Sequence, residues 1–99
     1  MSNGKEIWQI YFPAKVRKAK DNLPEEITFA FLALVTALKM DGPLQTRRRH
    51  FGKIEGRKDT WHCHLNSGRP TYVVIWKILD RTQKIIEVLY VGTHENAPY

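Results

Sequence analysis

Three histidines in the C-terminal half of the chain lie in or beside strand-like segments, His62, His64 and His94, and two cations accompany them, Arg69 and Lys77. Cleavage of RNA by its own 2′-hydroxyl group requires a base that accepts the hydroxyl proton and an acid that protonates the departing 5′-oxygen. Histidine, with an ordinary pKa near ~6.5, can serve as either at neutral pH. A guanidinium or ammonium group can hold the phosphate and the charge that develops on it. This set of residues, on a small basic chain, indicates a site that acts on RNA.

The segment Trp61–Asn66 alternates apolar and polar residues, which predicts a half-buried strand. His62 and His64 are two residues apart, so both should project from one face of that strand, and Cys63 should project from the other. A metal site is one alternative for this pair. Because Cys63 faces away, zinc would need His94 or His50 as a third ligand, and no carboxylate is close in sequence. We therefore expect no metal and no other cofactor, while histidines that face solvent without a role remain the second alternative.

Lys77 interrupts an otherwise apolar segment that is expected to be a central strand, so it should lie on the face that the helices leave open. Arg69 ends the loop between two strands, and His94 follows the last one. One open face can therefore gather the imidazoles, a guanidinium and an ammonium group.

The positive charge of the chain is concentrated in one region. The formal net charge is +6, and residues 47–69 hold seven Lys and Arg residues against two carboxylates. A basic segment of this kind is the electrostatic footprint of a partner that is a polyanion. A solvated loop in a basic protein is the alternative interpretation. The residues expected to bind phosphate are Arg47, Arg48, Arg49, Lys53, Arg69 and Lys77.

The order of the expected elements is β-α-α-β-β-β, which predicts an α+β domain with a mainly antiparallel sheet and two helices packed on one face. Asn22 and Glu25 have the spacing of a capping box and predict the start of the second helix, which should end at the breaker Asp41, Gly42 and Pro43. The expected elements are a strand at Ile7–Phe12, helices at Ala14–Asp21 and from about Asn22 to Met40, an irregular strand around Phe51–Ile54, and strands at Trp61–Asn66, Tyr72–Leu79 and Lys84–Val91.

The second expected helix carries no charge between Ile27 and Leu38. Its apolar stripe at helical spacing is Ile27, Phe31, Leu34, Val35 and Leu38. Phe29 and Leu32 lie off that stripe, and a helix that is apolar on more than one side needs cover on more than one side. A partner protein is expected to supply part of that cover.

Composition bounds the class of protein. The 99 residues, 42% of them apolar, predict a single domain over residues 1–99 with one modest core. There is no apolar run long enough to span a membrane, and the polar start MSNGKE lacks the core of a signal peptide, so we expect the cytoplasm. The single cysteine, Cys63, is consistent with a reducing compartment.

The chain resembles the RelE/ParE superfamily of toxins, the toxin halves of bacterial type II toxin–antitoxin pairs. The resemblance runs through IYFPAKVRKAKDNLPEEI, WHCHLNSGRPTYVVIWKI and IIEVLYVGTHENAPY, and covers nearly the whole chain. The ending GTHENAPY is most similar to the RelE branch that includes YafQ. The resemblance implies a metal-independent endoribonuclease, an mRNA interferase that cleaves mRNA on the ribosome, and a cognate antitoxin as partner.

By this resemblance His94 takes the catalytic position after the last strand, and His62 and His64 fall where the family places basic residues or histidines. Tyr99 falls near the aromatic residue that closes the site. The chain departs from RelE at Val73, where RelE has an arginine. The alternatives are a ParE-like toxin that inhibits DNA gyrase without catalysis, and a nucleic-acid-binding module. The histidines argue against gyrase inhibition, which needs no acid–base groups.

Overall fold

The computed structural model describes residues 7–99, and the polar segment 1–6, on which the cytoplasmic expectation partly rests, lies outside the described residues. The elements are β1 (Gln9–Tyr11), α1 (Ala14–Lys20), α2 (Glu25–Asp41), β2 (Gly52–Lys53), β3 (Thr60–His64), β4 (Tyr72–Asp80), β5 (Ile85–Thr93) and a short 3-10 helix, η1 (His94–Asn96).

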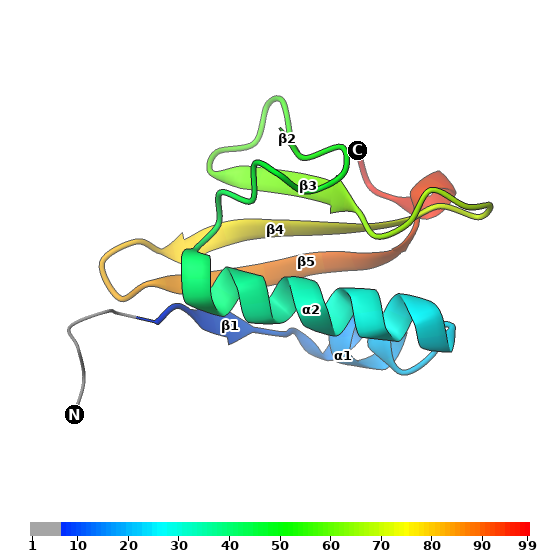
Figure 1. Ribbon diagram of the computed structural model, residues 1–99. Helices are drawn as coiled ribbons and strands as arrows, with labels where there is room; N and C mark the ends of the chain where they lie inside the picture. Colours follow the sequence, from blue (N-terminus) through cyan, green and yellow to red (C-terminus); the bar gives the residue numbers. More distant parts are fainter. Residues whose placement is uncertain (1–6) are drawn as a thin grey trace.

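The strands form one sheet in the order β1-β5-β4-β3-β2. β1 runs parallel to β5, and every other neighbouring pair is antiparallel. α2 crosses one face of the sheet, and α1 continues from β1 and lies against β5 (Figure 1). The expected α+β class, with its mainly antiparallel sheet, is confirmed. The irregular strand expected around residues 51–54 is present as the two-residue edge strand β2.

The hydrophobic core lies between α2 and the sheet. The buried residues of α2 are those of the expected apolar stripe, Ile27, Phe31, Leu34, Val35 and Leu38. Their partners on the sheet are Cys63, Val74, Trp76, Ile86, Val88 and Val91, joined by Val16 of α1. Burying one such aliphatic or aromatic side chain contributes about 1.5–3 kcal/mol relative to leaving it exposed. This core fixes which face of each strand points away from the helices.

The expected start of the second helix is wrong. α2 begins at Glu25 with Pro24 at the N-cap, and no side chain caps it. Asn22 lies in the turn between the helices, where its side-chain amide donates to the carbonyl of Lys18 (3.2 Å) instead. Glu25 and Glu26 occupy the first turn, where negative charge is favourable for the helix dipole. Asn22 therefore does not cap α2, because it lies two residues before the N-cap position.

The end of α2 falls at the expected breaker. Gly42 follows the helix with φ +90°, in the left-handed region that favours glycine, and a Cβ there would lie 3.0 Å from the indole nitrogen of Trp8. Both the backbone angle and the close indole require glycine at this position.

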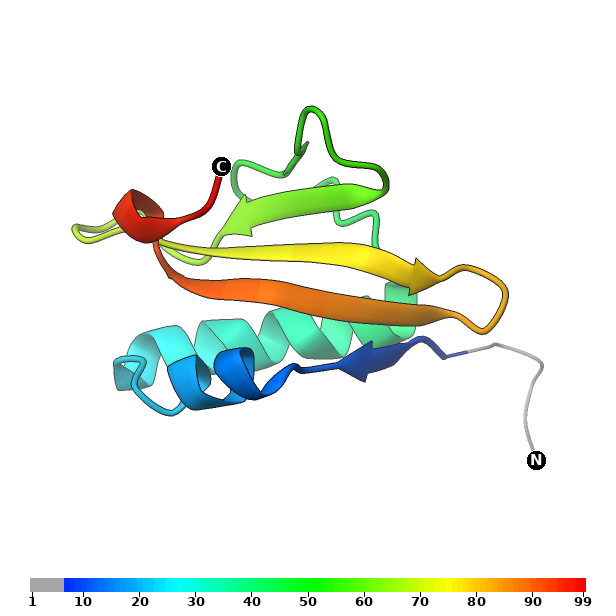
Figure 2. The ribbon, with the colours of Figure 1, turned by 180° about the vertical axis from the view of Figure 1, so that it is seen from behind.

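The face of the sheet that points away from the helices is less open than expected. Val73 and Ile75 alternate with the core residues of β4 and lie on this face, yet both are completely buried. Their cross-strand neighbours are large, since His64 and His62 stand opposite them on β3 and Tyr90 stands opposite Ile75 on β5. The C-terminal tail also turns back toward the end of β3 (Figure 2). In the middle of this face, the buried side chains of Val73 and Ile75 therefore form an apolar floor, which polar side chains cover.

No helix among the described residues is long and apolar enough to cross a membrane.

Trp76 links the core to the segment that follows α2. It is fully buried, and its indole nitrogen donates to the carbonyl of Pro43 at 2.9 Å. We predict that Trp76→Phe lowers the free energy of unfolding by about 1–3 kcal/mol, because a buried carbonyl loses its donor and the smaller ring packs less well. Urea denaturation measures this. Phe29→Ala, on the exposed side of α2, should change stability by less than about 0.5 kcal/mol, and equal effects of the two changes would contradict the account.

Candidate active site

Strand β3 presents His62 and His64 side by side on the face away from the helices. Their rings are 6.3 Å apart between centroids. Cys63 between them is fully buried in the core opposite Val74, as the alternation of a strand requires. The backbone nitrogen of His64 also donates to the carbonyl of Arg49 at 2.9 Å, which ties the basic segment to this strand.

His94 reaches the same face from the end of β5. Its backbone nitrogen donates to the carbonyl of Thr71 at 2.7 Å, and its ring lies edge-on to that of His64 with centroids 5.4 Å apart. The Tyr90 hydroxyl donates to the carbonyl of Thr93 at 2.7 Å and so fixes the residue before His94. Gly92 makes room for this bond, because a Cβ there would lie 2.6 Å from the Tyr90 hydroxyl oxygen.

Tyr99 closes the group from the C-terminal tail. Its ring lies 4.8 Å from that of His62 and 5.9 Å from that of His94 between centroids. Its hydroxyl is 3.3 Å from His62 Nδ1, within hydrogen-bonding distance. Burial raises the pKa of Tyr99, so the phenol is protonated at neutral pH and can donate to His62.

His50 is a fourth imidazole that sequence reasoning did not assign to the site. Its ring is stacked on that of His64, with centroids 4.2 Å apart and planes 28° apart. The position of His50 follows from the register in which β2 pairs with β3. Gly52 pairs with His62, so continuing the antiparallel ladder by two residues sets His50 opposite His64. His50 has φ +53°, an unusual angle for a residue with a side chain, at the point where the chain turns into β2.

The surroundings lower the pKa of two of these imidazoles. For His62 the main cause is burial, followed by the charges of His94 and His50. For His64 the main cause is also burial, followed by His50, His94, His62 and Arg49. The buried floor of Val73 and Ile75 explains the desolvation, since a cation is costly beside apolar groups. A pKa below the ordinary value leaves these rings neutral at pH 7, the form in which a nitrogen accepts a proton.

Arg69 is the expected cation that the structure brings to the imidazoles. It lines a hollow of about 650 Å³ together with His64, His94 and residues of the adjacent loop and tail. A guanidinium group at the rim of this hollow can make paired hydrogen bonds to a phosphate.

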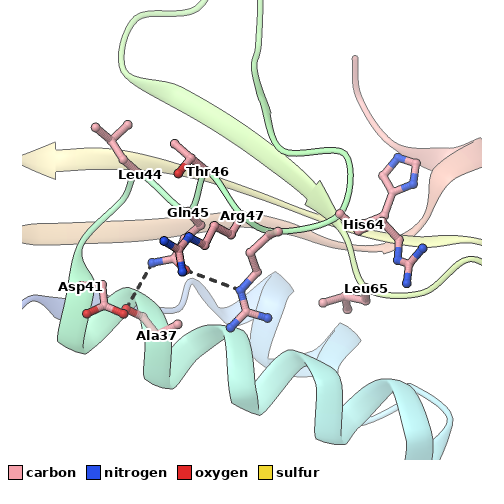
Figure 3. A pocket seen from close by; sticks show the side chains of 10 residues that line it. Ala37, Asp41, Leu44, Gln45, Thr46, Arg47, His64 and Leu65 are labelled. Atoms are coloured by element: carbon pink, nitrogen blue, oxygen red, sulfur yellow. Dashed lines mark hydrogen bonds between the residues drawn. The ribbon is translucent and has the colours of Figure 1, made fainter.

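Three arginines line a second hollow that also ends at His64 (Figure 3). This groove, of about 660 Å³, is lined by Arg47, Arg48 and Arg49 together with Ala37 and Asp41 of α2. Gln45 holds the basic segment to the helix. Its buried side-chain amide donates to the carbonyls of Gly42 (2.8 Å) and Ala37 (3.2 Å), and its oxygen accepts from Arg48 Nε at 3.5 Å. His64 therefore lies where two basic hollows meet.

The two remaining expected cations, Lys53 and Lys77, do not line either of these two hollows. Lys53 lines a third hollow with His62 and Tyr99. Lys77 lies on the same face of the sheet as the imidazoles, but it stands opposite Thr60 and Glu87 and lines a separate hollow with Lys58, Asp59 and Arg81. The structure therefore gathers Lys53 with the imidazoles and leaves Lys77 outside the group.

Among residues 7–99, no group of three or more His, Cys, Asp or Glu side chains could hold a metal ion. Cys63 faces the core, as expected, and burial raises the pKa of its thiol to about 11. The thiol is therefore protonated and turned away from the imidazoles.

Comparison with known proteins identifies the fold. No protein-family model and no curated protein matches the chain. Solved structures do match over most of its length. RelE in the archaeal RelE–RelB complex from Pyrococcus horikoshii has a TM-score of 0.72 and 22% sequence identity, over 92% of this chain and 99% of that one. The chain has the RelE fold.

Two structures of the E. coli RelE toxin give the same result at 16% identity. A mutant in the free state has a TM-score of 0.70, over 90% of this chain and 85% of that one. The isolated toxin has a TM-score of 0.64, over 92% of this chain and 88% of that one. The expected resemblance to the RelE/ParE superfamily is thus confirmed as a RelE fold, and at this identity the roles of individual residues must be argued from the site itself.

The mutual influence of the imidazoles can be measured. We predict that NMR titration finds the pKa values of His62 and His64 below the ordinary ~6.5, and that His94→Ala raises both, because it removes a neighbouring positive charge. Glu95, next to His94, offers the opposite control, since Glu95→Gln removes a negative charge and cannot raise either pKa. Unchanged pKa values in His94→Ala would contradict the described geometry.

Proposed function

We propose that the chain is a RelE-type toxin, a metal-independent endoribonuclease that cleaves mRNA on the ribosome in the cytoplasm. The observation that carries this proposal is the contact group of His50, His62, His64, His94 and Tyr99 beside the arginines of two basic hollows. A surface that only binds nucleic acid or gyrase needs the arginines, but has no need of several imidazoles in contact with one another.

The proposed reaction uses His64 and His94 as the acid–base pair. A neutral imidazole takes the proton of the RNA 2′-hydroxyl, whose oxygen then bonds to the adjacent phosphorus. The bond from phosphorus to the 5′-oxygen breaks, and the second imidazole, protonated, gives that oxygen its proton. The products are a 2′,3′-cyclic phosphate and a free 5′-hydroxyl group. His64, with its lowered pKa and its place in both basic hollows, suits the role of base.

The other members of the group support this pair. Both ring nitrogens of His62 face other residues of the chain. Nδ1 faces the Tyr99 hydroxyl, and Nε2 lies so close to Gly52 that a Cβ on that glycine would be 3.3 Å from it. His62 is therefore better placed to orient Tyr99 than to contact a substrate. His50, stacked on His64, keeps that ring in place and helps to lower its pKa. Tyr99 offers a half-exposed ring on which a base of the RNA can stack.

Arg69 supplies the charge that the RelE arginine would provide. Val73, at that arginine's place in the sequence, is fully buried, whereas Arg69 lines the hollow that holds His64 and His94. Arg47, Arg48, Arg49 and Lys53 extend the positive surface along which the phosphates of the RNA lie. Lys77, outside the group, would contribute through longer-range attraction alone.

The cognate antitoxin is the proposed protein partner. The archaeal RelE to which this chain is similar was crystallised with RelB. The outer side of α2 leaves Phe29 64% and Leu32 48% exposed, and an exposed apolar surface of this kind marks an interface. An apolar segment of the antitoxin would cover it.

We predict that His94→Ala and His64→Ala each lower the rate of RNA cleavage by about 10²–10⁴-fold, the usual contribution of one proton transfer, and that His62→Ala lowers it less. The measurement is cleavage of free RNA in chelator and of mRNA on translating ribosomes. Asn96→Ala, an exposed change in the same 3-10 helix as His94, is the matched control. His94→Ala should fold normally and lose toxicity in a growing bacterium.

Full activity of His94→Ala would remove the proposed active site. Loss of DNA supercoiling by gyrase in the presence of the chain, without any RNA cleavage, would instead establish the ParE-like alternative. Binding of RNA without either activity would establish a binding module.

The second prediction of this proposal concerns the antitoxin. Phe29→Asp together with Leu32→Asp should weaken binding of the protein encoded beside this chain by about tenfold or more, because a charge would be buried in an apolar interface. Titration calorimetry measures the affinity. The paired change Glu25→Gln and Glu26→Gln, in the first turn of α2, is the control. Unchanged affinity of the Asp variant would place the partner on another surface.

A further inference from the structure

Arg57 makes a contact that links two segments far apart in the sequence. Its Nη2 donates to the carbonyl of Pro98 at 3.1 Å, across 41 positions of the chain. Arg57 belongs to the loop between β2 and β3, and Pro98 precedes Tyr99, whose ring contacts that of His62. Arg57 is one of the seven basic residues of the segment 47–69, and its position in the sequence alone indicates no particular role.

The loop that carries Arg57 is fixed to the sheet. The nitrogen of Ile54 donates to the carbonyl of Thr60 at 2.9 Å, and the nitrogen of Arg57 donates to the carbonyl of Ile54 at 3.3 Å. Gly56, with φ +80°, allows the turn between them. Arg57 therefore belongs to a short loop whose backbone is held by hydrogen bonds, so the position of its side chain is restricted.

The C-terminal tail has few other supports. Ala97 still donates to the carbonyl of His94 at 3.2 Å, which closes η1. Beyond it, within residues 7–99, residues 98 and 99 make two polar contacts, the Arg57 bond and the approach of the Tyr99 hydroxyl to His62. Pro98 and Tyr99 are both exposed. Without a restraint, a tail of this kind would sample many positions.

We propose that Arg57 is a positioning residue that holds the tail by the Pro98 carbonyl and so sets the Tyr99 ring against His62 and His94. Its effect on cleavage rests on the proposed ribonuclease activity, whereas its effect on the tail does not. Arg57 and Tyr99 both line the hollow of about 380 Å³ that also includes Lys53 and His62. The ring placed there by Arg57 forms one wall of the space that a nucleotide beside the scissile bond would enter.

A direct contact between Arg57 and an RNA phosphate is the competing explanation, and a double-mutant cycle separates the two. If Arg57 acts through the tail, Arg57→Ala should lower the cleavage rate by about 10- to 100-fold, the cost of a small misplacement of a positioned group. In a Tyr99→Ala background it should then have no further effect. Arg57→Lys, which can still donate to the carbonyl, should restore most of the rate.

Lys58→Ala is the matched control, because it removes the same charge from the next residue of the same loop and Lys58 is exposed. Its effect should add to that of Tyr99→Ala. If Arg57→Ala also adds to Tyr99→Ala, Arg57 meets the RNA directly and the proposal is overturned.

A readout without RNA tests the tail alone. Tyr99→Ala uncovers His62, whose pKa is lowered mainly by burial, so NMR titration should find that pKa raised toward its ordinary value. Arg57→Ala should raise it by a similar amount, and the double variant should go no further. An unchanged His62 pKa in Arg57→Ala would overturn the proposal. Absence of cleavage by the parent chain would count against the ribonuclease alone and leave this titration decisive.

Discussion

The site depends on one constraint, which is that successive side chains of strand β3 point alternately to opposite faces of the sheet. Cys63 must lie in the core beneath α2, and because successive side chains of a strand point to opposite faces, His62 and His64 must point away from it. A slip of one residue would bury both imidazoles and expose the thiol. The pairing of β3 with the fully buried residues Val73–Trp76 of β4 holds this register in place.

The remaining groups reach His64 because their segments neighbour β3 and β4. The chain leading into β2 brings His50, and the end of β5 brings His94. This assembly is costly in two ways. The neighbouring positive charges and burial lower the pKa values of His62 and His64, and His50 holds a backbone angle that costs of order 1–3 kcal/mol. The core of α2 and the sheet stabilises the fold enough to keep them together, which is the arrangement expected where strain and shifted pKa values serve a function.

Much of the fold followed from periodicity, because the stripe of α2 and the alternation of β3 are imposed by burial. The predicted helix start was wrong, because Pro24 holds the N-cap position and the spacing of Asn22 and Glu25 alone does not reveal this. His50 was missed because its role depends on the register of a two-residue edge strand. Arg57 was missed for a similar reason, since its partner Pro98 is distant in sequence and is brought close only by the folded tail.

The central claim is that imidazoles activate the 2′-hydroxyl group of the RNA itself. The most direct test compares an mRNA with the same mRNA carrying one 2′-deoxynucleotide immediately 5′ to the cleaved bond, both on translating ribosomes. The account predicts that the first is cut to leave a 2′,3′-cyclic phosphate and a 5′-hydroxyl group, and that the second stays intact at that bond. Cleavage of the deoxy-substituted mRNA at the same position, or products with a 5′-phosphate, would contradict it.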